Sequence, residues 1–153
     1  MNSNEIFRRV QVALELSESD IVAIFAAADE VVTATQVGQW LRTNDDPQWS
    51  AVPSLAAFLD GLINHRRGRK DGPAPAREIN LTNNRVFMKL RIAMDLSADG
   101  ILEIFGLAGL ELSRHELSAL FRRPDNKHYR ACDDMILAGF LDGLQTKLRS
   151  AGA

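Results

Sequence analysis

The residues best suited to binding chemistry in this sequence are two clusters of basic side chains. The first cluster is His65, Arg66, Arg67, Arg69 and Lys70. The second combines Arg122, Arg123, Lys127, His128 and Arg130 with Tyr129. Because arginine and lysine neutralise phosphates and an aromatic ring can stack on a base, both clusters are candidate nucleic-acid sites. For either cluster alone, the simpler explanation is that basic residues favour a helix C-terminus and keep a connecting segment solvated.

Two further basic residues, Arg114 and His115, begin the second of two helices predicted within residues 101–123. This helix-link-helix pattern is similar to DNA-binding helix-turn-helix units, whose second helix enters the major groove. It departs from theirs because Phe105 stands four residues before Gly109, where a small residue is usual, and because the link is longer. An ordinary helical hairpin with solvated charges is therefore the simpler interpretation.

Two carboxylates recur inside apolar helices, and each is followed by a glycine. The pairs are Asp60 with Gly61 and Asp142 with Gly143. Paired carboxylates can transfer protons or bind a metal, but no histidine or second acid stands at i+3 or i+4 from either. We therefore expect structural roles, with Arg42 and Arg122 as candidate partners of the two aspartates. Since glycine costs about 1 kcal/mol relative to alanine inside a helix, the two glycines predict close helix crossings.

The remaining reactive residue types form no recognisable catalytic or metal site. His65, His115 and His128 are the only histidines, and their spacing matches no zinc motif. Cys132 is the only cysteine, so no intramolecular disulfide can form, and no phosphate-binding loop of the GxxxxGK[ST] type occurs. The sequence thus predicts no metal and no cofactor, and it favours a binding protein over an enzyme.

The charges are distributed unevenly along the chain. The net charge is -2, but residues 1–64 carry three arginines against nine acids, whereas residues 65–153 carry fifteen basic and eleven acidic residues. An anionic partner would therefore prefer the second half, although a mixed solvated surface is the simpler interpretation.

The composition is typical of a helical protein of the cytoplasm. Of the 153 residues, 46% are hydrophobic, which is enough to build a core, and aromatic residues are few. No apolar run reaches the roughly 18 residues of a membrane span, and the N-terminus does not resemble a signal peptide. We expect no membrane association.

An internal repeat organises the chain. A shift of 80 residues aligns Phe7 with Phe87, and the segments around Phe25 and Phe105 also match. At a shift of 82, LAAFLDGL of residues 55–62 matches LAGFLDGL of residues 137–144 at seven of eight positions. Two ordered blocks of identity indicate a tandem duplication and predict a pseudo-twofold arrangement.

Each copy is predicted to contain about four main helices, which makes the fold all-α. Apolar residues recur at helical spacing, and Thr33 with Gln36 and Ser113 with Glu116 both form the capping-box pattern that begins a helix. We expect a helical repeat at 1–65, a basic Gly/Pro linker at 66–82 and a second repeat at 83–150.

The segment LRIAMDLSADGILEIFGLAGLELSRHELSALFRRPDNKHYRACDD, the HRRGRKDGP linker and the doubled FLDGL motif resemble the YehS-like family of small bacterial proteins. That family is a tandem repeat of unknown function. The resemblance covers essentially the full chain and implies a bacterial cytoplasmic protein. It supplies no reaction, cofactor or catalytic residue.

Three functions are compatible with these residues. Binding of DNA or RNA through the basic linker and the second repeat is favoured by the charge asymmetry. The alternative is a protein-interaction module that uses grooves between helices, which the acidic first half supports. An enzyme with a site assembled from distant residues is favoured by nothing specific, and a homo-oligomer is compatible with all three.

Overall fold

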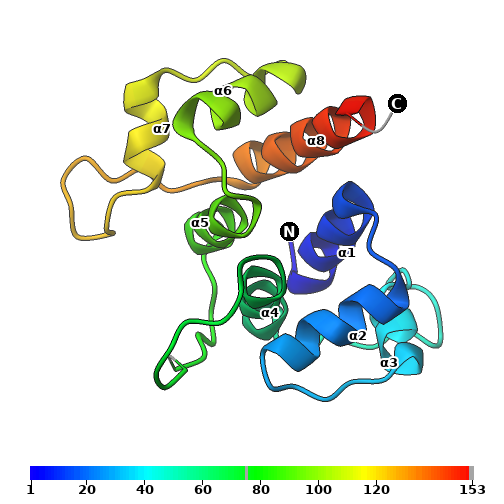
Figure 1. Ribbon diagram of the computed structural model, residues 1–153. Coiled ribbons are helices and arrows are strands. Elements are labelled where there is room, and N and C mark those ends of the chain that lie inside the picture. The colour runs from blue at the N-terminus through cyan, green and yellow to red at the C-terminus, as the bar shows by residue number, and fades with distance from the viewer. Residues whose placement is uncertain (75, 152–153) are drawn as a thin grey trace. The chain divides into compact units, whose positions relative to one another are not determined.

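The computed structural model describes residues 1–74 and 76–151, and all regular structure in these ranges is helical (Figure 1). The first four helices are α1 (Ser3–Leu14), α2 (Glu18–Ala27), α3 (Ala34–Trp40) and α4 (Leu55–Arg67). The second four are α5 (Asn83–Met94), α6 (Ala98–Leu107), α7 (Arg114–Leu120) and α8 (Asp134–Ala151). The predicted all-α fold and the tandem duplication are confirmed.

The chain divides into two compact units, Met1–Leu81 and Thr82–Ala153. Within each unit the fourth helix packs mainly on the second, as α4 does on α2 and α8 does on α6. The linker after α4 belongs to the first unit. No helix among the described residues is long and apolar enough to cross a membrane.

Three phenylalanines form the centre of each core. In the first unit the rings of Phe7 and Phe58 lie 4.7 Å apart, and Phe25 lies 5.9 Å from Phe58. In the second unit Phe87, Phe105 and Phe140 occupy the equivalent places, and all six rings are fully buried. The repeat detected in the sequence is therefore a repeat of core positions, and it fixes how the four helices of each copy meet.

The helix starts follow the local sequence. The side chains of Ser17, Thr33 and Ser113 each accept a hydrogen bond from the backbone N–H three residues later, and the backbone N–H of each donates in return to the side chain of that later residue. The capping boxes predicted for the two third helices are thus present. The fourth helices differ, because α8 begins a turn earlier, where Asp133 accepts a hydrogen bond from the backbone N–H of Ile136.

Both predicted close crossings are present. A Cβ atom at Gly61 would overlap the carbonyl oxygen of Ile24, and one at Gly143 would overlap the carbonyl oxygen of Ile104. Glycine is required there because the backbones of the second and fourth helices touch.

Candidate functional site

The second-unit cluster is positioned by α7 and by the connection between α7 and α8. The capping box fixes the first turn of α7, since Ser113 Oγ accepts from the Glu116 N–H and Glu116 Oε1 accepts from the Ser113 N–H, each at 3.0 Å. This turn carries Arg114 and His115. Arg114 forms an ion pair with Asp99 of α6, so a nearby carboxylate already partly neutralises its charge.

A buried asparagine of α5 anchors the connection between α7 and α8. Asn84 Nδ2 donates to the carbonyl oxygens of Leu120 at 2.9 Å and Arg130 at 2.8 Å. Asn84 Oδ1 accepts from the Cys132 N–H at 2.8 Å and from the Tyr129 hydroxyl at 3.0 Å. Both ends of the connection are thereby held against the core. Tyr129 takes part in this anchor, so its ring is not free to swing onto a base.

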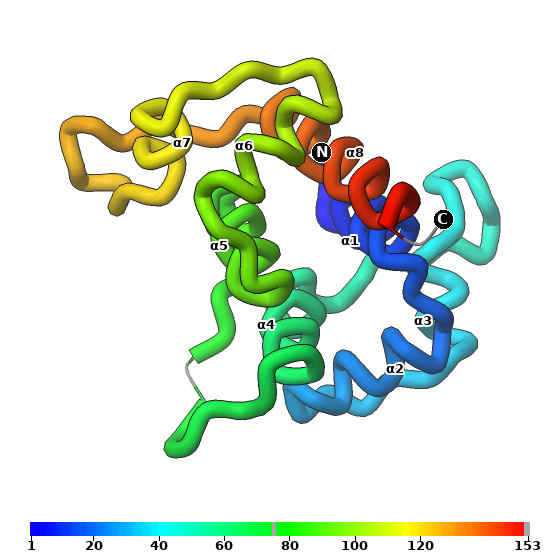
Figure 2. Tube along the Cα trace, turned by 45° about the horizontal axis from the view of Figure 1, so that its top comes forward, coloured from blue at the N-terminus to red at the C-terminus, as the bar shows by residue number. Residues whose placement is uncertain are grey.

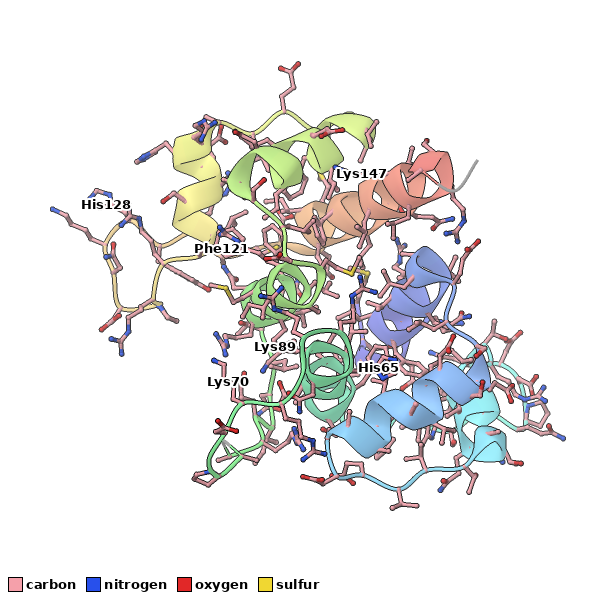
Figure 3. The ribbon with its side chains drawn as sticks, in the orientation of Figure 1. His65, Lys70, Lys89, Phe121, His128 and Lys147 are labelled. Carbon is pink, nitrogen blue, oxygen red and sulfur yellow. The ribbon has the colours of Figure 1, made fainter. Side chains whose placement is uncertain are left out.

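Two tight turns lie between the anchored ends. The Asn126 N–H donates to the Arg123 carbonyl at 2.9 Å, and the Tyr129 N–H donates to the Asn126 carbonyl at 3.0 Å. These turns expose Arg123, Lys127 and His128. The His128 side chain points away from the helices of its unit (Figure 3). Neither Arg123 nor Lys127 forms an ion pair with any residue that the structure describes.

The other basic residues of this cluster have different surroundings. Arg130 pairs with Glu116 at 3.1 Å. Arg122 Nε is buried and has no hydrogen-bond partner in the described part of the chain. His115 and His128 lie together, with ring centroids 6.5 Å apart. The structure therefore brings all of the predicted second-unit residues onto one helix turn and one loop.

The equivalent surface of the first unit lacks this charge. At a shift of 80, Thr43 replaces Arg123, Pro47 replaces Lys127, Gln48 replaces His128 and Thr35 replaces His115. The backbone is anchored in the same way, because Asn4 Nδ2 donates to the carbonyl oxygens of Trp40 and Ser50 and Asn4 Oδ1 accepts from the Val52 N–H. The two units thus share one scaffold, and only the second carries the basic side chains on it.

The linker cluster belongs to the first unit and is partly engaged there. Arg69 pairs with Asp29 at 2.8 Å and also donates to the carbonyl oxygen of Ala26. The donated hydrogen bond holds the pKa of the Asp29 carboxyl below its ordinary value. Arg77 donates to the carbonyl oxygen of Ala28, so two linker arginines bind the C-terminal end of α2, which attracts cations. Figure 2 shows that the linker leaves α4 close to the C-terminal end of α2. Arg66, Arg67 and Lys70 are exposed.

The predicted partners of the repeated aspartates were wrong. Arg77 of the linker forms an ion pair with Asp60, with 2.8 Å between the guanidinium nitrogen and the carboxylate oxygen. Arg42 instead donates a hydrogen bond of 3.0 Å to the carboxylate of Asp46. Arg42 and Asp46 are only four residues apart, so their ion pair costs less conformational entropy than a pair between Arg42 and a separate helix. In the second unit Arg122 forms no ion pair with any described residue, since the counterpart of Asp46 is the neutral Asn126, and Asp142 is exposed on α8.

The helix-turn-helix resemblance gains no support from the geometry. Residues 108–113 separate α6 from α7, whereas the DNA-binding motif has a turn of about 3–4 residues. Helix α7 buries Leu117 and Leu120 and is only 7 residues long. Such a short helix leaves little more than its first turn to enter a groove.

Sequence reasoning missed Asn4 and Asn84. The signal was available, because the same shift of 80 that aligns Phe7 with Phe87 aligns these two asparagines. A polar residue repeated on the apolar face of a helix needs a hydrogen-bond partner when buried, and both are at most 8% exposed.

Cys132 is buried beside this loop, and no group of three or more potential metal ligands occurs among the described residues. Burial, with a smaller contribution from Asp133, raises the pKa of the Cys132 thiol to about 12. Because the thiolate is the nucleophile, this thiol is inert in the folded protein near neutral pH.

We expect Cys132 to react with a disulfide reagent at about pH 8 roughly a thousandfold more slowly in the native protein than in urea, where its pKa returns to about 8.5. Absorbance of the released thiol measures both rates. Cys132→Val provides a control without a thiol, and valine is the residue at the equivalent position 52 of the first copy. Equal rates with and without urea would show that the native thiol is accessible and ionised.

Comparison with known proteins agrees with the doubled architecture. The family model described as "Protein of unknown function (DUF1456)" matches residues 3–68 and again residues 83–150. The uncharacterized protein YehS of Escherichia coli (strain K12) is 40% identical over 151 residues, which cover 96% of each chain. No solved structure matches. The chain therefore belongs to the DUF1456 family, whose model it matches once in each of its two units.

Proposed function

We propose that the second unit binds the phosphate backbone of nucleic acid through α7 and the α7–α8 connection. The observation that carries the proposal is the pair of exposed cations, Arg123 and Lys127, on a loop whose two ends Asn84 anchors. A loop that is already ordered loses little conformational entropy when it binds. Arg122 precedes this pair on the chain, whereas Arg114 and Arg130 are ion-paired with Asp99 and Glu116.

The chemistry of the surface favours phosphates over bases. Arginine and lysine replace the condensed counterions of a nucleic acid, and the release of these ions drives binding. Base recognition would need groove-reading side chains or an aromatic platform. Tyr129 is tied to Asn84, and α7 is short. Binding is therefore expected to be independent of sequence and to weaken steeply with salt.

The first-unit cluster is not needed for this proposal. Arg69 is paired with Asp29, and the linker arginines serve to hold the linker on α2. Arg66, Arg67 and Lys70 remain exposed, so their contribution is a separate question that variants can answer.

We expect Arg123→Gln with Lys127→Gln to reduce the salt dependence of binding to duplex DNA. Each lost phosphate contact lowers the log-log slope by about 0.9, so the double variant should lose about 1.8. Fluorescence anisotropy over a salt series measures this slope for duplex DNA, single-stranded DNA and structured RNA.

The matched control is Arg8→Gln with Arg42→Gln, which removes the same charge from the first unit and should leave the slope unchanged. Equal losses in both double variants would assign the effect to net charge rather than to this surface. Absence of binding by all three nucleic acids at low salt, where attraction is strongest, would refute the proposal in favour of a protein partner.

A further inference from the structure

The histidines of the second unit meet on the proposed binding surface. His115 lies in the first turn of α7 and His128 on the following loop, and the ring centroids are 6.5 Å apart. Both side chains are exposed. The third histidine, His65, lies in the last turn of α4 in the first unit and provides an internal reference.

The two histidines are held in place by the backbone around them. The Ser113–Glu116 capping box fixes the backbone of the first turn of α7, and this turn carries His115. The His128 N–H donates to Asn126 Oδ1 at 2.8 Å inside the two tight turns, and Asn84 anchors the ends of the loop. The backbone positions that carry the two rings are thus ordered, which keeps the two side chains within reach of each other.

Charged side chains of both signs surround the rings. Arg123 and Lys127 are exposed on the same loop. Of the nearby carboxylates, Glu116 is occupied by Ser113 and Arg130, and Asp99 is occupied by Arg114. Asp125 is exposed on the loop and is the carboxylate that could compete for a protonated ring.

We infer that His115 and His128 form a proton-linked phosphate subsite, in which both imidazoles bind the nucleic-acid backbone in their charged form. This inference rests on the proposed function and deepens it. A neutral imidazole offers one N–H donor, whereas an imidazolium offers two and adds a positive charge. The ordinary pKa of histidine, about 6.5, places this change within the physiological range.

The sign of the pH dependence follows from linkage. A bound phosphate favours the charged imidazolium, so binding takes up protons and affinity rises as pH falls. The hydrogen bond from the Ser113 N–H holds the pKa of the Glu116 carboxyl below its ordinary value. The basic residues stay charged throughout. Histidine is the side chain that ordinarily changes charge between about pH 8 and pH 5.5, and the double histidine variant tests whether these two rings carry the dependence.

The test uses the full chain and a duplex DNA of mixed sequence, titrated at low salt at about pH 8, 6.5 and 5.5. We expect the affinity to rise by about tenfold across this range, and the salt slope to steepen by up to about 1.8 as two contacts are added. His115→Gln with His128→Gln should abolish both effects, whereas His65→Gln should retain them. The imidazole proton signals of His115 and His128 should move when DNA binds, and that of His65 should not.

The possible outcomes separate this inference from the proposed function. Binding that is equally strong at each pH would overturn the subsite while leaving the phosphate-binding surface intact. A pH dependence that persists in the double histidine variant would also overturn it, because another group would carry the proton. Absence of binding at every pH would remove the proposed function, and the subsite with it.

Discussion

Replacing Gly143 with alanine is expected to lower the free energy of unfolding by about 2–3 kcal/mol, the cost of overpacking a tight core contact. The new Cβ would overlap the Ile104 carbonyl oxygen, so α6 and α8 must move apart. Alanine has the better helix propensity by about 1 kcal/mol, so a loss of stability would mean that the clash outweighs the propensity. Urea unfolding followed by far-ultraviolet circular dichroism measures the change.

Gly106→Ala is the matched control for this prediction. Gly106 lies in α6, and a Cβ there would meet nothing within 4 Å. This variant should be neutral or more stable by up to about 1 kcal/mol. If Gly143→Ala proved as benign as Gly106→Ala, the contact between the backbones of α6 and α8 would not be as close as described.

Replacing Asn84 with alanine is expected to cost about 3 kcal/mol. The side chain makes four hydrogen bonds, and its removal leaves the buried carbonyl of Leu120 and the N–H of Cys132 without this partner. Hydrogen exchange at the Cys132 amide should accelerate, because the anchor of the α7–α8 connection is lost. The same urea titration gives the free energy.

The neighbouring Asn83 provides the control for Asn84. Asn83 Nδ2 donates to Asp134 at 2.8 Å in an exposed position, so Asn83→Ala should cost about 0.5 kcal/mol or less. Similar costs at the two positions would argue that the buried asparagine does not hold the loop. Nucleic-acid affinity should also fall in Asn84→Ala if the proposed surface depends on an ordered loop.

The helices and the duplication could be predicted from the sequence because both depend on local or repeated patterns. Apolar residues at helical spacing define the buried faces, and Thr33 with Gln36 identifies a helix start within four residues. Gly61 and Gly143 predicted the close helix crossings because glycine destabilises a helix interior, yet it occurs at the same position of both repeats. These signals do not require knowledge of which distant residues meet.

The ion pairs and the candidate site were decided by the tertiary structure. Arg77 of the linker pairs with Asp60 of α4, and His115 of α7 lies beside His128 of the loop whose ends Asn84 holds. Long charged side chains can reach several partners, and their choice depends on the path of loops with no periodic pattern. The sequence by itself therefore determined the helices that residues 1–74 and 76–151 form, and the basic second half of the chain. The fold alone decided which of the basic residues remain exposed, because that depends on which carboxylates and carbonyl oxygens lie within reach.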